Sequence, residues 1–448
     1  MIKIFEKKRE NKSIYELLTY DANDKVILTE TLRYETATFE HSNKFTYLIL
    51  YNEEMKPYSE VFSYLNTTIE SFSINSRLKA LTALRLLYIY QHIISKKIIE
   101  FNVTDVNNLK SFLRGLSPAG QALSFELITN RSNETINGYL SVYRNFLTHL
   151  NCENSYLFKT IKGKKTSSES DTPHSSERYA SSENNTKDQG VIPYYISVFD
   201  FQNILYEIRK HFSSCEECMV RLMYENGLRL GEVLGLTFDD ITSEVYEGKK
   251  KFFVYLRNRV SDNKDQHAKT CMKVNDVKEY NSKGYKKEGY GFQKVEISEI
   301  LYSKINDYIE TYHAYALKNK GYNKFSLADR ARKTEPYESD NYYVFLNTLG
   351  RPMSYQTWNN RLKAIFNAVN IPIDTGTKEH NLSHRFRHGF AVFNVIYMKT
   401  DALQLMVKMR HRNVSTVSVY FRLTITDQIK IKTDFTNQLY EIIPELEL

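Results

Sequence analysis

Apolar residues change their spacing along the 448 residues of the chain, and each change predicts a different kind of region. Residues 1–55 are β-leaning, because nearly every residue between 45 and 51 is apolar or a good strand former. Leu28, Leu32 and Tyr34 indicate a partner strand for this segment. We therefore expect an N-terminal accessory region with β structure, placed beside the domain that follows.

From residue 56 to residue 160 the apolar spacing is helical. Pro57 and Ser59 are expected to open a first helix, and apolar residues at helical spacing predict a second around 81–93. Thr104 is expected to cap a third helix and Asn133 a fourth, because short polar side chains accept the first free N–H groups of a helix. These helices predict a small α-helical domain.

Residues 161–191 carry almost no apolar side chains. Such a segment cannot bury enough surface to offset its ordering entropy, so we expect a flexible linker. The remainder, 192–448, predicts one mostly helical domain with a small β insertion. Strands are expected over 252–256 and 293–297, with helices over 198–211, 214–226, 229–236, 298–318, 354–369, 383–398 and 401–409. The predicted fold class is mainly α with small β elements.

Composition narrows the class of protein. No apolar run reaches the ~18 residues of a membrane span, and the N-terminus lacks the apolar core of a signal peptide. We therefore expect a cytoplasmic protein. The net charge of +8 permits a polyanionic partner without proving one. Six basic residues of the helical region either hold phosphates or form ordinary exposed faces: Arg77, Lys79, Arg85, Lys96, Lys97 and Arg144.

The chain has four cysteines, Cys152, Cys215, Cys218 and Cys271, and scattered thiols fit a reducing compartment. Cys215 and Cys218 have the spacing of a metal-binding pair. Structural zinc takes four ligands, and no second Cys or His pair lies nearby in the sequence. We therefore expect no metal site here.

The residues best suited to chemistry lie near the C-terminus. His384 and Arg387 are three apart, so they share one face of the predicted helix. An arginine fork matches two phosphate oxygens, and an imidazole beside it can transfer a proton near neutral pH. His411 and Tyr420 are nine apart, about 900° on a regular helix, so they can meet only if the helix breaks. We expect His411 in a turn and Tyr420 on a later element.

A second arginine lies far upstream. Gly227 is expected to end one helix in the left-handed conformation, which puts Arg229 in the opening turn of the next. Considered alone, Arg229 would be a surface residue paired with Glu232 at i+3.

Three segments together resemble the tyrosine recombinases, also called phage integrases. Residues 226–241, beginning Asn-Gly-Leu-Arg-Leu-Gly-Glu, are similar to the family's first arginine box. Residues 382–391 resemble its H-x-x-R-H box, and residues 409–420 resemble its closing box with the histidine-to-tyrosine spacing intact. The resemblance implies a helical, SAM-like core-binding domain over 56–160, a linker, and an α+β catalytic domain over 192–448.

The resemblance also implies roles for individual residues. Arg229 and Arg387 would clamp the non-bridging oxygens of a scissile DNA phosphate. His384 and His411 would assist by hydrogen bonding and proton transfer, and Tyr420 would attack the phosphorus. No metal or other cofactor is expected, because two guanidiniums neutralise the charge and the covalent link conserves the bond energy.

The family uses a hairpin lysine as general acid for the leaving 5′-oxygen. Lys269 is the best match in this chain, and Lys264 and Lys273 are rivals. Two positions depart from the family's usual pattern: Met409-Arg410 stands where Leu-Gly is common, and Gly389 stands where Thr is common.

The sequence therefore predicts a site-specific DNA recombinase, the integrase or transposase of a mobile element in a bacterial nucleoid. The expected partners are double-stranded DNA and accessory DNA-bending or directionality proteins. We also expect the chain to be a monomer in solution and to assemble on DNA as a homo-tetramer. Residues 1–55 would be an accessory DNA-binding arm or a cap, and the tail, 424–448, would dock on a neighbouring protomer or on its own domain. The rival hypotheses are a type IB topoisomerase and a DNA-binding protein without catalysis.

Overall fold

In the computed structural model the chain forms two compact units, Met1–Lys187 and Asp188–Leu448, which are described separately below. The structure describes residues 2–9, 12–41, 45–117, 123–165, 174–184, 193–258, 268, 271–272, 274, 279, 281–315, 343–373, 381–421, 433 and 441. No helix in this part of the chain combines the length and apolarity needed to cross a membrane.

The first unit begins with strands. A four-stranded sheet has the order β3-β2-β1-β6, formed by β1 (Ile2–Arg9), β2 (Lys12–Tyr20), β3 (Val26–Leu32) and β6 (Leu123–Glu126). Strand β1 pairs antiparallel with β2 and parallel with β6. A separate antiparallel pair joins β4 (Thr36–Glu40) to β5 (Thr46–Leu50). The partner predicted for β5 was therefore wrong, because the short connection after β4 makes that strand, and not β3, its neighbour.

The helices of this unit lie where the apolar spacing predicts them. They are α1 (Ser59–Ser63), the π-helical turn Tyr64–Thr68, α2 (Ile74–Ile94), the turn Ile98–Glu100, α3 (Val103–Arg114), α4 (Asn133–His149) and the turn Tyr156–Phe158. Two predicted caps were wrong by one or two residues. Asn102 caps α3 and Ser132 caps α4, each accepting a hydrogen bond from a first-turn N–H.

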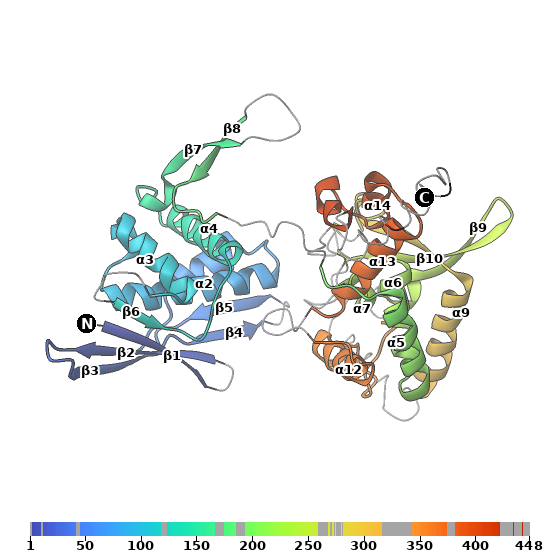
Figure 1. Cartoon of the computed structure of the whole chain (residues 1–448), viewed down its shortest axis with the longest axis horizontal. Coiled ribbons are helices and arrows are strands. Elements are labelled where there is room, and N and C mark those ends of the chain that lie inside the picture. The colour runs from blue at the N-terminus through green and yellow to red at the C-terminus, as the bar shows by residue number, and fades with distance from the viewer. Residues whose placement is uncertain are drawn as a thin grey trace. The chain divides into compact units, whose positions relative to one another are not determined.

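The sheet and the helices of the first unit share one apolar core, which Figure 1 shows as a strand layer against a helix layer. Ile4, Tyr15 and Leu48 from the strands are fully or almost fully buried together with Leu84 and Leu109 from the helices. The N-terminal strands are thus integral to this unit.

Four of the six basic residues that the sequence analysis singled out in this unit have internal partners. Arg85 donates to the carbonyls of Tyr34 and Ser13 at 2.6 and 2.7 Å, and Arg77 is buried against Phe45. Arg144 lies over the ring of Tyr179, 3.9 Å from its centroid, and Lys96 pairs with Asp105 at 3.1 Å. The three arginines are buried or half-buried, whereas Lys96, in spite of its ion pair, Lys79 and Lys97 are exposed.

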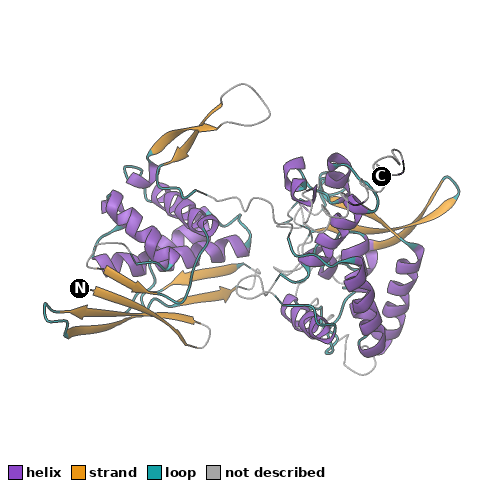
Figure 2. Ribbon diagram, in the orientation of Figure 1, coloured by secondary structure: helices purple, strands orange, loops and turns teal. Residues whose placement is uncertain are grey.

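The segment predicted as a linker begins with a β-hairpin. Strand β7 (Thr160–Lys165) pairs antiparallel with β8 (His174–Tyr179), as Figure 2 shows. After it, Glu183 forms ion pairs with Lys110 at 2.9 Å and Arg114 at 2.6 Å. The expectation of a flexible linker was therefore wrong for β7, β8 and Glu183. The segment has few apolar residues of its own, but side chains on distant helices form contacts with it.

The second unit is mostly helical. Its helices are α5 (Val198–His211), α6 (Ser214–Glu225), α7 (Leu230–Leu234), α9 (Glu299–Tyr308) with the π-helical turn Ile309–His313, α12 (Tyr355–Ala368), α13 (His384–Ile396) and α14 (Ala402–Lys408). Short 3-10 turns cover Phe238–Asp240, Val414–Thr416 and Ser418–Phe421. All seven predicted helices are present, with bounds close to those expected.

One sheet, of order β11-β10-β9, accompanies these helices. Strands β10 (Lys249–Arg257) and β11 (Phe292–Ile297) were predicted, and β9 (Ile241–Tyr246) was missed. The side chains of β9 are exposed or half-buried, so they lack the apolar alternation that marks a strand. Glu247 and Gly248, both with positive φ, form the tight turn that pairs β9 with β10.

Candidate active site

Gly227 forms the turn that presents Arg229. Helix α6 ends at Glu225, and Gly227 has φ of +59°, the left-handed conformation predicted for it. A Cβ on this residue would lie 2.6 Å from the ring of Phe390 on α13, so only glycine fits. Arg229 then occupies the N-cap position of α7.

Glu232 pairs with Arg229 as the i+3 spacing suggested, but the pair is not an ordinary surface contact. The Glu232 carboxylate is fully buried, with one oxygen 2.9 Å from Nη1 of Arg229 and the other 2.8 Å from Nη2 of Arg410. Burial opposes its ionisation, but the charges of Arg410, Arg229 and Arg387 outweigh burial and lower its pKa to about 2. A carboxylate is therefore fixed at the centre of three guanidiniums.

Arg387 is the most buried of these arginines, with 1% of its surface exposed. Its guanidinium donates hydrogen bonds to the carbonyl oxygens of Gly227 and Met409. These two bonds join three segments that are far apart in the sequence. Burial and the like charge of Arg229 lower its pKa to about 9. The group still carries its positive charge at neutral pH.

Arg410 belongs to this cluster, although it was not among the predicted site residues. It donates to the carbonyls of Gly227 at 3.1 Å and Asn226 at 3.3 Å, besides its ion pair with Glu232. Its φ is +55°, in the region that favours glycine. Its place where glycine is common in the family was a sequence signal for this conformation, whereas its spatial partners could be recognised only from the structure.

His411 lies in the turn that follows α14, as predicted. The N–H of Arg410 bonds Val407 O and the N–H of His411 bonds Met406 O, each at 2.9 Å, which is a Schellman ending of the helix. Nδ1 of His411 is 2.5 Å from the hydroxyl of Thr416. Burial and the nearby guanidiniums lower the pKa of His411 to about 4, so its ring is neutral at pH 7.

Tyr420 lies on the separate 3-10 turn Ser418–Phe421, again as predicted. Its hydroxyl is 2.6 Å from Nδ1 of His388 on α13. Burial raises the pKa of Tyr420 to about 12, while the charges of Arg387 and Arg229 act in the opposite direction. The phenol is therefore held protonated within the field of two guanidiniums.

His388 was not among the predicted site residues. Burial, together with the neighbouring His384, Arg387 and His411, lowers its pKa to about 3. The ring of His384 is 4.9 Å from that of His388, because the two are four apart on one helix face. That i,i+4 spacing was a signal in the sequence that could have placed His388 beside the site.

The structure thus brings Arg229, His384, Arg387, His411 and Tyr420 into one cluster from four separate elements. Lys269 and its rivals Lys264 and Lys273 lie outside the described residues, as does the tail apart from Thr433 and Glu441.

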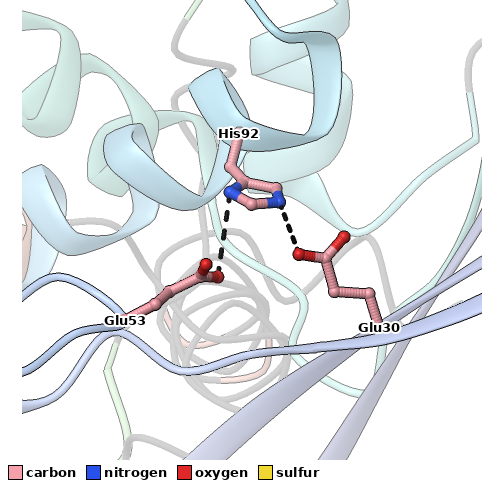
Figure 3. A group of neighbouring side chains, drawn as sticks. All are labelled: Glu30, Glu53 and His92. Carbon is pink, nitrogen blue, oxygen red and sulfur yellow. Dashed lines mark ion pairs between the residues drawn. The ribbon is translucent and has the colours of Figure 1, made fainter.

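Within the described residues, one group of three side chains meets a distance criterion for a metal site, and it lies in the first unit. Figure 3 shows that Glu30 and Glu53 face opposite nitrogens of the His92 ring, at 3.0 and 3.7 Å. Nδ1 of His92 also contacts the hydroxyl of Tyr34 at 3.2 Å, so the ring joins strand and loop residues to α2. Cys215 and Cys218 are buried in α6, and burial raises the pKa of each thiol.

The chain matches a known protein family in sequence. The sequence model of the phage integrase family matches residues 196–426, which is more than half of the chain and includes the whole cluster. The chain belongs to the phage integrase family. The chain therefore has the tyrosine-recombinase fold, mainly helical with small sheets, and the predicted family and fold class are confirmed. No curated protein matches the chain in sequence.

Several solved structures are similar to this phage integrase at low identity. XerA recombinase is 14% identical, with 84% of this chain and 96% of that chain covered and a TM-score of 0.33. A Tn1549 transposon integrase in complex with transposon right end DNA is 16% identical, with 84% and 98% covered and a TM-score of 0.47. XerH site-specific recombinase in a post-cleavage complex is 12% identical, with 81% and 80% covered and a TM-score of 0.46.

Gly389, one of the departures from the family pattern, has a local cause in this phage integrase. A Cβ at this position would lie 2.5 Å from the carbonyl oxygen of Ile196 and 2.6 Å from the ring of Tyr224. The N–H of Ile196 donates to the carbonyl of Arg385, so the chain before α5 lies directly against α13. The larger residue common in the family does not fit this close approach.

Proposed function

We propose that this integrase is a site-specific DNA recombinase that cuts and rejoins DNA through a 3′-phosphotyrosyl intermediate at Tyr420. The observation that carries the proposal is the placement of the Tyr420 phenol within the field of Arg229 and Arg387, whose charges favour its ionised form. An anionic phosphate bound by the same guanidiniums would lie next to a hydroxyl that can attack it.

The proposed step conserves the energy of the phosphodiester bond. The phenol of Tyr420 passes its proton along the hydrogen bond to Nδ1 of His388 and on to solvent, and its oxygen attacks the phosphorus. The bond from phosphorus to the 5′-oxygen breaks, and that oxygen takes up a proton as a 5′-hydroxyl. Arg229 and Arg387 bind the non-bridging oxygens, and Lys269 supplies the proton. The reverse attack by another 5′-hydroxyl rejoins strands without ATP, because the phosphotyrosyl ester retains the bond energy.

His388 and His411 act in neutral form in this proposal. His388 holds the phenol through a 2.6 Å hydrogen bond, and its low pKa makes it an orienting group that does not retain a proton. His411 and His384 would donate hydrogen bonds to phosphate oxygens. The guanidiniums, which neighbour both Tyr420 and His411, carry the electrostatic stabilisation.

The proposed substrate is double-stranded DNA with specific recombination sites, bound by four copies of the chain, and the biological outcome is integration or excision of a mobile element. The net charge of +8 supports an anionic partner. Similarity to a transposon integrase and to recombinases bound to their DNA substrates is consistent with this proposal.

A nicked suicide substrate tests the proposal. The small fragment released after cleavage cannot religate, so wild type should accumulate a covalent protein–DNA adduct that a denaturing gel resolves. Tyr420→Phe should give no adduct. Tyr397→Phe, at an exposed tyrosine just after α13, is the matched control and should behave like wild type. An adduct that forms with Tyr420→Phe would show that another group attacks.

The topoisomerase alternative is separated by a second assay. Relaxation of supercoiled plasmid that lacks any recombination site would favour a type IB topoisomerase, whereas exchange between paired sites would exclude it. Binding of DNA without an adduct in wild type would favour the non-catalytic alternative.

A further inference from the structure

Arg410 occupies a backbone position that ordinarily favours glycine. It follows the last turn of α14 with φ of +55°, a conformation that is strained for a residue with a side chain. Its side chain is 9% exposed and reaches back to Asn226, Gly227 and Glu232. The side chain therefore makes contacts that a glycine could not make, although the backbone is strained at this position.

The contacts of Arg410 are with the same groups that position the two predicted catalytic arginines. Glu232 is shared between Arg410 and Arg229, one carboxylate oxygen to each. The carbonyl of Gly227 is shared between Arg410 and Arg387. Removal of Arg410 would leave Arg229 as the only ion-pair partner shown for the buried carboxylate.

The charge balance of the cluster depends on this residue. Three guanidiniums and one carboxylate give a net charge of +2 among Arg229, Arg387, Arg410 and Glu232, and without Arg410 the net charge would be +1. A phosphodiester carries one negative charge, and attack by a phenolate brings a second into the transition state. The observed cluster therefore matches the charge of the transition state.

Arg410 also retains a free donor. Among the described residues, its buried Nε has no hydrogen-bond acceptor, although buried N–H groups are nearly always paired.

We propose that Arg410 is a positioning residue for phosphate binding, which neutralises Glu232 so that Arg229 and Arg387 keep their charge for the scissile phosphate. This inference rests on the proposed function, since it names Arg410 as the residue that sets the net charge of the same phosphate-binding site. Arg410 acts through Arg229, Arg387 and Glu232.

The test compares two substrates whose scissile groups differ in charge. One suicide duplex carries the ordinary phosphate and the other a neutral methylphosphonate at the same position. On the phosphate, Arg410→Met should slow adduct formation about tenfold or more, as expected for one charge lost several ångströms away. On the methylphosphonate, Arg410→Met should slow adduct formation only slightly, because this reacting group carries one negative charge fewer than the phosphate. Arg410→Lys should recover part of the rate.

Matched variants separate charge from folding. Arg412→Met removes an exposed arginine two residues away and should leave the ratio of the two rates unchanged. Arg410→Gly relieves the left-handed strain, so it should keep the fold in thermal denaturation while losing the rate on the phosphate. Equal losses on both substrates for Arg410→Met would overturn the inference, because a purely structural role does not depend on substrate charge.

A binding measurement makes the inference independent of catalysis. Calorimetry with inorganic phosphate should show affinity about tenfold weaker for Arg410→Met than for wild type, and no change for Arg412→Met. Unchanged phosphate affinity would overturn the inference. Weaker phosphate binding in a protein that forms no adduct would uphold the charge assignment while the proposed function fails.

Discussion

At the scale of single residues, His388 and His411 show how burial sets the chemistry of this site. Protonating an imidazole that is buried beside guanidiniums costs free energy, because the new charge is poorly solvated and repelled. The pKa of His388 therefore falls to about 3 and that of His411 to about 4. Both rings are thus hydrogen-bonding groups at neutral pH and add no charge to the cluster. Arg229, Arg387 and Arg410 supply positive charge to the cluster, and a guanidinium does not titrate near pH 7.

The low pKa of His388 predicts a pH dependence of stability. Between the ordinary histidine value of 6.5 and about 3, the unfolded chain binds a proton that the folded protein excludes. The unfolding free energy should therefore fall as pH falls through this window, by up to about 1.4 kcal/mol per pH unit for one histidine. Urea denaturation at pH 4.5–7.5 should give a shallower pH slope for His388→Gln than for wild type.

The control for this prediction is His211→Gln, at an exposed histidine that ends α5. Its slope should equal that of wild type. A His388→Gln protein with the wild-type slope would mean that the folded state accepts the proton at position 388.

At the scale of elements, α13 combines three polar side chains on one face with close packing on the other. His384, Arg387 and His388 follow the i, i+3, i+4 pattern, so one helix delivers an arginine and two imidazoles to the same place. The opposite face contains Phe386, fully buried, and Gly389, which lies against the chain before α5. The orientation of the helix, and with it the site, depends on that packing.

This packing predicts opposite effects for two helical glycines. Gly389→Ala would place a methyl group 2.5 Å from a backbone oxygen and should lower the unfolding free energy by about 1–3 kcal/mol. Gly138→Ala in α4 meets only the flexible end of Lys79 and should raise stability by up to ~1 kcal/mol, because alanine is the better helix former. Urea denaturation measures both, and equal effects would contradict the packing argument.

At the scale of the whole molecule, net charge is the property that matters for a polyanionic partner. The chain carries 61 Lys and Arg against 53 Asp and Glu. Arg77, Arg85 and Arg144 of the first unit have internal partners and are not free to bind phosphate. The phosphate contacts of this unit should therefore come from exposed residues such as Lys79 and Lys97.

DNA binding should accordingly weaken steeply with salt, because each phosphate contact releases counterions. For a footprint of about six phosphates, the affinity should fall more than tenfold between 100 and 300 mM salt. Fluorescence anisotropy with a labelled duplex measures this slope, which Arg85→Met should leave unchanged and Lys97→Met should reduce. An affinity independent of salt would argue against a DNA-binding function.

The sequence by itself determined the parts of this protein that depend on local order. Helical spacing predicted all seven helices of the second unit, and the number of residues between His411 and Tyr420 required the helix to break where it does. The left-handed glycine at 227 followed from its place after a helix. Three boxes in order sufficed to identify the family, because each keeps its reactive side chains at fixed spacing.

Tertiary structure alone decided what depends on neighbours far apart in the chain. The parallel pairing of β1 with β6, the ion pairs of Glu183 with α3 and the burial of Glu232 against Arg410 each arise from contacts that no local pattern encodes. The same holds for Arg410, whose partners lie some 180 residues upstream, and for the hydrogen bond from Tyr420 to His388. Local spacing sets which side chains share a face, whereas packing sets the charge, burial and partners that give those side chains their chemistry.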